Sequence, residues 1–147
     1  MSPDAVDAPA LRRLYLDTSA YLCVLLGEDG SKRLSDETAG AELLSSVLLV
    51  LEARRNLVRL AREGILTPDQ YKRCVDRLEA DMNQFVLRDL TLDLCASTPL
   101  PAVATPRSLD LAHLRTALWF HAADDIHRFV TVDASQEQAA KELGLPV

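Results

Sequence analysis

Two short apolar runs, one near each end of the chain, stop at an aspartate and are followed by residues that favour a helix. The first covers residues 14–16 and ends at Asp17; the second covers residues 129–132 and ends at Asp133. Short apolar runs bounded by polar segments predict buried strands, and buried strands that alternate with helices form a largely parallel sheet with helices on its faces. The chain is therefore predicted to be an α/β sandwich.

The remaining residues are predicted to alternate in the same way. Helices are expected from the Thr18-Ser19 cap to residue 26 and over residues 31–38, 47–62, 68–84, 91–96, 109–122 and 135–143, and further strands over residues 41–44 and 85–90. The helix starts are placed where a Ser or Thr can accept a backbone N–H: Thr18-Ser19, Ser45-Ser46, Thr67 before Pro68, and Ser108. Three prolines, Pro99, Pro101 and Pro106, leave residues 94–106 without a firm prediction.

Length and composition indicate one globular domain. The chain has 147 residues, of which 48% are hydrophobic and 26% charged. Residues 1–10, rich in Asp, Pro and Ala, are expected to be a flexible leader, and residues 11–147 the domain. No apolar run approaches the ~20 residues that cross a bilayer, and the N-terminus lacks a signal-peptide pattern, so we expect a cytoplasmic protein that does not enter a membrane. Cys23, Cys74 and Cys95 are expected to be reduced and mostly buried.

Four acidic residues are candidates for a functional site: Asp17, Glu52, Asp110 and Asp133. The two aspartates at strand ends lie where ligands bind in open α/β sheets, beyond the carboxyl ends of the strands. Each acid also has an ordinary structural explanation. Asp17 and Asp133 can cap helices, Glu52 can lie on a solvated helix face, and Asp110 can complement a helix dipole. His113 can orient Asp110 or fill a half-buried position, and we favour the second.

The net charge of −6 argues against a protein that binds nucleic acid, because phosphate recognition normally uses a surplus of Lys and Arg. The objection weakens if carboxylates converge on divalent cations, since bound cations invert the local field that a phosphate meets. The negative net charge is therefore a reason to expect a metal at the acidic site if the protein binds nucleic acid.

Four short motifs occur in order along the chain, each around one of the four acids. They are residues 15–20 (Tyr-Leu-Asp-Thr-Ser-Ala), Ser45-Ser46 with Glu52, residues 108–114 (Ser-Leu-Asp-Leu-Ala-His-Leu), and residues 129–133 with Ala139-Ala140 and residues 144–147. In this order they resemble the motifs of PIN domains, and within that family those of VapC-type toxin ribonucleases, from Leu14 to Val147. In the third motif of the family an arginine commonly precedes the Leu-Asp pair. Here Ser108 precedes Leu-Asp, and Arg107 lies one place earlier than that arginine.

The resemblance implies a three-layer α/β/α sandwich with a mostly parallel central sheet, whose acids hold Mg²⁺ or Mn²⁺ and hydrolyse RNA. Mg²⁺ prefers carboxylate oxygens and keeps waters and phosphate oxygens as its other ligands. We assign Asp17, Asp110 and Asp133 to the metal, and Glu52 to positioning or deprotonating the attacking water. Ser19 is assigned to hold Asp17 or a metal-bound water. The resemblance further implies an RNA substrate, a cognate antitoxin protein as partner, and a homodimer.

Other classes of protein also place an aspartate at the end of a parallel strand. A haloacid-dehalogenase phosphatase would need a second Asp at position 19, where the chain has Ser19. A signalling receiver would need a Lys after a late strand, but Lys141 lies too far into the last helix. The stronger alternative is a PIN-like module that binds protein or RNA without turnover. The presence of all four acids argues against that alternative.

Overall fold

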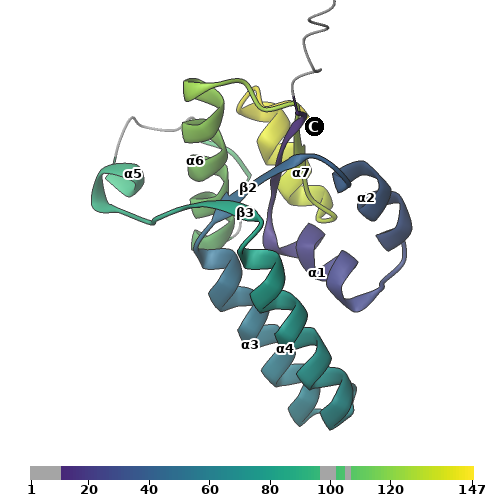
Figure 1. Ribbon diagram of the computed structural model, residues 1–147. Coiled ribbons are helices and arrows are strands. Elements are labelled where there is room, and N and C mark those ends of the chain that lie inside the picture. The colour runs from purple at the N-terminus through teal and green to yellow at the C-terminus, as the bar shows by residue number, and fades with distance from the viewer. Residues whose placement is uncertain (1–10, 97–101, 105–106) are drawn as a thin grey trace, which may run out of the picture.

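The computed structural model describes residues 11–96, 102–104 and 107–147, so the expected leader and Pro99, Pro101 and Pro106 lie outside the described residues. In chain order the elements are β1 (Arg13–Leu16), α1 (Thr18–Leu26), α2 (Ser31–Thr38), β2 (Glu42–Ser46), α3 (Leu48–Arg62), α4 (Pro68–Met82), β3 (Phe85–Arg88), α5 (Leu92–Ala96), α6 (Ser108–Ala123), β4 (Arg128–Val130) and α7 (Ala134–Glu142) (Figure 1). No helix within these three ranges has both the length and the apolar character needed to span a membrane.

The strands of the described residues form one four-stranded sheet in the order β3-β2-β1-β4, and every neighbouring pair is parallel. Side chains alternate between the two faces of a strand. Tyr15 of β1 therefore packs against α6 and α7, whereas Leu14 and Leu16 pack against α1 and α2. This arrangement confirms the predicted α/β sandwich, with a parallel sheet between two helical layers.

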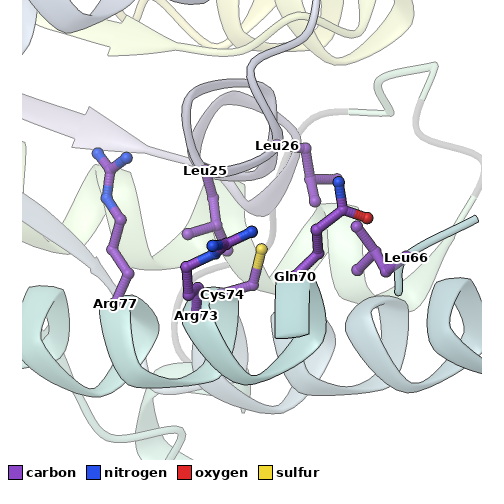
Figure 2. A pocket seen from close by; sticks show the side chains of 7 residues that line it. All are labelled: Leu25, Leu26, Leu66, Gln70, Arg73, Cys74 and Arg77. Carbon is purple, nitrogen blue, oxygen red and sulfur yellow. The ribbon is translucent and has the colours of Figure 1, made fainter. Parts of the chain in front are cut away.

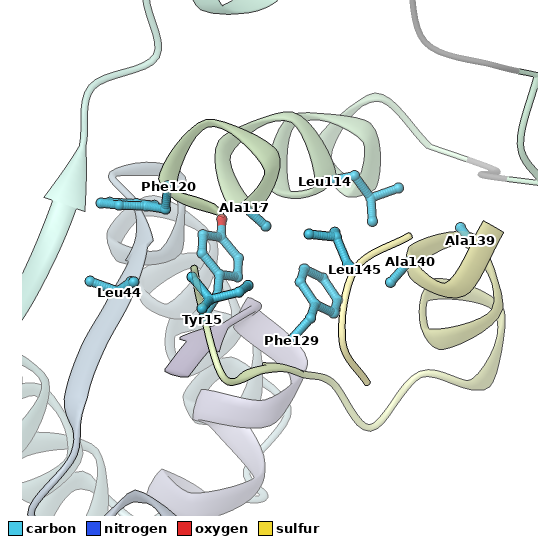
Figure 3. Packing of buried hydrophobic residues seen from close by; sticks show 10 residues of the cluster. Tyr15, Leu44, Leu114, Ala117, Phe120, Phe129, Ala139, Ala140 and Leu145 are labelled. Carbon is cyan, nitrogen blue, oxygen red and sulfur yellow. The ribbon is translucent and has the colours of Figure 1, made fainter. Parts of the chain in front are cut away.

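The core between the sheet and helices α6 and α7 is built around two aromatic rings. Tyr15 of β1 and Phe129 of β4 stack with 5.4 Å between their ring centroids. They pack with Leu114 and Ala117 of α6 and with Ala140 of α7 (Figure 3). Because each fully buried large side chain contributes roughly 1.5–3 kcal/mol, this cluster holds the middle of α6 firmly against the sheet.

Helices α3 and α4 pack side by side as a pair that extends beyond the sheet (Figure 1). Their contact is apolar: Leu49, Ala53 and Leu57 of α3 lie in one buried cluster with Leu78 of α4. α3 begins two residues after β2 ends, so its N-terminal turns stay beside the carboxyl end of the sheet. Glu52 lies in these turns.

The two strand ends that carry an aspartate differ from the prediction in detail. The N-cap of α1 is Asp17, so Thr18 and Ser19 lie inside the helix and the predicted cap is wrong. β4 ends at Val130 instead of continuing to residue 132. The reason is that the N–H of Val132 donates to the Ser19 hydroxyl oxygen and not to a neighbouring strand.

The other predicted caps have mixed outcomes. The Thr67 cap of α4 is confirmed, and it forms a complete capping box. The Ser108 cap is wrong, because Ser108 is the first residue of α6 and its N-cap, Arg107, offers no side-chain hydrogen bond. At α3, the hydroxyl of Ser46 accepts the N–H of the first helical residue, whereas the Ser45 hydroxyl donates to a carbonyl of β1.

The three cysteines form no disulfide with one another, and all three lie within the described ranges. Only Cys23 is buried; Cys74 is half-buried and Cys95 is exposed. The expectation that they are mostly buried is therefore wrong for Cys95, which lies on the short helix α5, where Leu94 is the buried residue.

Candidate active site

A cavity of about 240 Å³ lies where the carboxyl end of β1 faces the N-terminal turns of α3 and α6. It is lined by all four predicted acids and six other residues: Asp17, Thr18, Ser19, Leu22, Glu52, Asn56, Arg107, Asp110, His113 and Asp133. The acids come from four places in the fold: Asp17 after β1, Glu52 in α3, Asp110 in the first turn of α6, and Asp133 before α7. The parallel topology thus gathers side chains from both ends of the chain.

Asp17 is buried, and both of its carboxylate oxygens accept hydrogen bonds. Oδ1 accepts from the Ser19 hydroxyl at 2.7 Å and from the Ala20 N–H at 3.1 Å, and Oδ2 accepts from the Thr131 hydroxyl at 2.6 Å. Burial raises the pKa of Asp17 above its ordinary value, although these hydrogen bonds act in the opposite direction. The carboxylate is therefore fixed in position but costly to ionise without a nearby cation.

Glu52 is held at one of its two oxygens. Oε1 accepts from the Thr18 hydroxyl and from Nε2 of His113, both at 2.9 Å. Burial raises the pKa of Glu52, but the hydrogen bond and charge interaction with His113, together with the Thr18 bond, outweigh it, so the pKa is lowered overall. Glu52 is therefore an anion at neutral pH. Its Oε2 accepts no hydrogen bond from the residues that the structure describes.

Asp110 is the acid whose carboxylate charge is least stabilised by hydrogen bonds from the described residues. Its backbone carbonyl accepts from Nε2 of Gln136 at 2.9 Å, but its carboxylate accepts no hydrogen bond from the described part of the chain. Burial raises the pKa of Asp110, and the negative charges of Asp133 and Asp17 raise it further. The carboxylates in this cavity therefore repel one another.

Asp133 is exposed and caps α7. Its Oδ1 accepts from the N–H and hydroxyl of Ser135 at 2.9 and 2.6 Å, and from the N–H of Gln136 at 3.3 Å. The Ser135 hydroxyl bond lowers the pKa of Asp133, with the backbone bonds acting in the same direction. One carboxylate oxygen of Asp133 thus caps α7, and the side chain also lines the cavity.

Three polar residues that support the acids were missed or misread in the sequence: Thr131, His113, and Thr18, which was predicted as part of a helix cap but donates to Glu52. The Thr131 hydroxyl donates to Asp17 and accepts the N–H of Asp133 at 3.1 Å, so it joins two of the acids. The only signal for it was a hydroxyl residue two places before Asp133. His113 was expected to fill a half-buried position, but it is 2% exposed and bonded to Glu52. Helical spacing could not reveal that pair, because 61 positions separate the two residues.

The cavity has the donor set of a site for a hard divalent cation. Carboxylate and hydroxyl oxygens predominate, and these are the ligands that Mg²⁺ prefers. Burial and the repulsion from Asp133 and Asp17 raise the pKa of Asp110, and a bound cation relieves repulsion of this kind. Among the described residues, no three His, Cys, Asp or Glu side chains are already placed to hold a metal ion. The acids therefore fit a divalent cation in chemistry, and binding one would require them to move closer together.

A second cavity, of about 290 Å³, lies between α1 and α4. It is lined by Leu25, Leu26, Leu66, Gln70, Arg73, Cys74 and Arg77 (Figure 2). Its lining has no carboxylate, and its charged groups are the guanidinium groups of Arg73 and Arg77. This cavity therefore lacks the groups for metal-assisted hydrolysis, and the acidic cavity is the candidate active site.

Two curated relatives of the chain, both named Ribonuclease VapC35, come from Mycobacterium tuberculosis, strains CDC 1551 / Oshkosh and ATCC 25618 / H37Rv. Each is 30% identical to the chain over 137 residues, which are 91% of this chain and 94% of the relative. No protein-family model matches the sequence. The similarity thus extends over nearly the full length of both proteins.

Proposed function

The chain belongs to the VapC ribonuclease family, and on this premise we propose that it is an endoribonuclease that hydrolyses RNA with Mg²⁺ or Mn²⁺ as the toxin of a toxin-antitoxin pair. The observation that carries the proposal is the single cavity shared by Asp17, Glu52, Asp110 and Asp133. Two of these acids have a raised pKa and two a lowered one. Perturbed carboxylates gathered in one cavity are typical of functional sites.

Three aspartates are assigned to the metal. Asp17 offers a carboxylate fixed by the Ser19 and Thr131 hydroxyls, and Asp110 offers one that is free of hydrogen bonds to the described residues. Asp133 reaches the same cavity from the start of α7. A bound divalent cation would supply an activated water and would offset charge on the phosphate.

Glu52 is assigned to orient the attacking water. Its lowered pKa makes it a weak base at neutral pH, since efficient general bases have a pKa near the working pH. Of the two roles expected from the sequence, positioning is therefore favoured over deprotonation. Oε2, which accepts no hydrogen bond within the described ranges, is the atom that would accept one from the water.

Arg107 is assigned to the RNA phosphate. It lines the same cavity as the acids and lies directly before α6. A guanidinium group can donate two parallel hydrogen bonds to a phosphate. With Arg107 beside the acids, the cavity would present a cation to the substrate despite the net charge of −6.

Partners and location are part of the same proposal. Membership of the VapC family supports a cognate antitoxin protein as the binding partner. We include a homodimer and a cytoplasmic location as expectations that follow from the family resemblance.

A nuclease assay on the purified protein tests the proposal. RNA is incubated with the wild type in Mg²⁺ or Mn²⁺, with the same protein in chelator, and with Asp17→Ala. Cleavage is expected only from the wild type with metal. Asp76→Ala, which removes an exposed aspartate of α4, is the matched control and should cleave normally. Cleavage that survives Asp17→Ala would contradict the assignment, and a wild type that binds RNA without cutting it would support the silent binding module.

A further inference from the structure

His113 lies buried beneath the acidic cavity, with partners on both ring nitrogens. Its Nδ1 is 2.7 Å from the Tyr15 hydroxyl, and its Nε2 is 2.9 Å from Oε1 of Glu52 and 3.1 Å from the Thr18 hydroxyl. The exposed fraction is 0% for Tyr15 and 2% for His113. A chain of hydrogen bonds therefore runs from the core of the sheet to one of the four acids.

The partners determine where the imidazole carries its proton. The Glu52 carboxylate can only accept, so Nε2 must donate to it; an unprotonated Nε2 at 2.9 Å would set two lone pairs against each other. In the neutral ring Nδ1 is then unprotonated and accepts from the Tyr15 hydroxyl. The Thr18 hydroxyl donates to the same Glu52 oxygen. The donors and acceptors at the Tyr15 hydroxyl, the two ring nitrogens of His113, the Thr18 hydroxyl and Oε1 of Glu52 are thus consistent with one another.

The elements that carry the group pack closely against one another. Tyr15 is in the central strand β1 and stacks on Phe129, and its ring meets that of His113 edge-on with centroids 5.9 Å apart. His113 is in α6 and Glu52 in α3, so each hydrogen bond joins a different pair of elements. Fixing Oε1 by two donors also fixes the direction of Oε2.

We propose that His113 is a positioning residue for the active site: it holds Glu52 by Oε1 so that Oε2 faces the attacking water, and the Tyr15 hydroxyl donates to Nδ1 of the tautomer that the Glu52 carboxylate requires. The inference rests on the proposed function, because it assigns a purpose to the geometry of Glu52. Removal of such a supporting hydrogen bond typically lowers activity about 10- to 100-fold. The loss should fall on kcat with little change in KM, since Glu52 would act on the water and not on the RNA.

Two substitutions of similar size separate positioning from packing. The amide of Gln reaches the place of Nε2, so His113→Gln can still donate to Glu52; the amide of Asn reaches only the place of Nδ1, so His113→Asn cannot. We expect kcat to fall about 10- to 100-fold in His113→Asn and to be largely restored in His113→Gln. His121→Asn, on the same helix but outside the cavity, is the control and should keep the wild-type kcat. Equal losses in both His113 variants, or a rise in KM in place of the fall in kcat, would overturn the proposal.

A spectroscopic measurement keeps the proposal testable if a variant is unstable or the protein does not cleave RNA. The nitrogen-15 spectrum of His113 in the wild type should show a protonated Nε2 and an unprotonated Nδ1. Glu52→Gln should shift the Nε2 signal, and Tyr15→Phe, which keeps the ring, should shift the Nδ1 signal. A wild type with the opposite tautomer would refute the inference alone. Absence of RNA cleavage with these signals in place would refute the proposed function and leave the hydrogen-bonded support of Glu52 standing.

Discussion

At the scale of single residues, the capping role of two aspartates is compatible with the place proposed for them in the active site. Asp17 caps α1 and Asp133 caps α7, as an aspartate after a strand commonly does. Each nevertheless lines the acidic cavity. The sequence could place an aspartate after each strand, although it assigned the α1 cap to Thr18-Ser19 and extended β4 two residues too far. It could not show that Thr131 joins the two aspartates, because that contact depends on β1 and β4 being neighbours.

The Thr131 hydroxyl is expected to stabilise the fold through Asp17. Thr131→Val removes the donor to Oδ2 and leaves a buried carboxylate oxygen without it. The free energy of unfolding should fall by about 1–3 kcal/mol, the usual cost of a buried polar group that loses its partner. Chemical denaturation at pH 7 measures the change. Thr38→Val is the control, because that hydroxyl donates to carbonyls of its own helix, and it should cost clearly less.

The burial of Asp17 and Asp110, with repulsion added at Asp110, predicts an unusual pH dependence of stability in the absence of metal. The pKa values of Asp17 and Asp110 are raised, so the folded protein holds these protons more tightly than the unfolded chain. Stability should therefore increase as the pH falls from neutrality toward the ordinary Asp pKa of about 3.9. Below that range the lowered pKa values of Glu52 and Asp133 act in the opposite direction, and stability should be lost.

Asp110→Asn tests that explanation. Removing this charge should raise the melting temperature in chelator and flatten the increase between neutral and mildly acidic pH. Thermal melts over a pH series would show both effects. A variant that melts lower than the wild type throughout the series would contradict the role given to repulsion.

At the scale of elements, local sequence signals predicted that a helix forms more accurately than they predicted the residue at which it begins. The Thr67 cap and the Pro68 start of α4 are features of its own sequence, and α4 begins at Pro68 as predicted, although it ends at Met82, two residues earlier than expected. The Ser108 prediction failed because a serine at a helix start is a cap only if its backbone is extended; here Arg107 has that conformation. Residue type alone could not decide between neighbouring positions.

The two helix starts predict different costs of substitution. Thr67→Ala removes a capping hydroxyl and should lower the free energy of unfolding by about 1 kcal/mol. Ser108→Ala removes a hydroxyl that caps nothing and should have little effect. Urea denaturation of the two variants side by side gives the comparison. A larger loss for Ser108→Ala would mean that α6 begins differently from the structure described.

At the scale of the whole molecule, the parallel sheet determines which distant residues meet. The order β3-β2-β1-β4 places the ends of β1 and β4 side by side, and α3 and α6 flank them. The motif order along the chain allowed the four acids to be predicted as a set. Their hydrogen-bonded support by Thr18, His113 and Thr131 could not be predicted, since it links residues on different elements.

The central claim is that the acidic cavity binds a divalent cation and uses it to cut RNA. The most direct measurement is Mn²⁺ binding by electron paramagnetic resonance, made on the same samples of wild type and Asp110→Asn that are assayed for RNA cleavage. The wild type should bind Mn²⁺ and cleave RNA over the same range of Mn²⁺ concentration. Asp110→Asn should bind more weakly and cleave at least about 100-fold more slowly. Cleavage by the wild type without bound Mn²⁺, or equal binding and cleavage by Asp110→Asn, would contradict the claim.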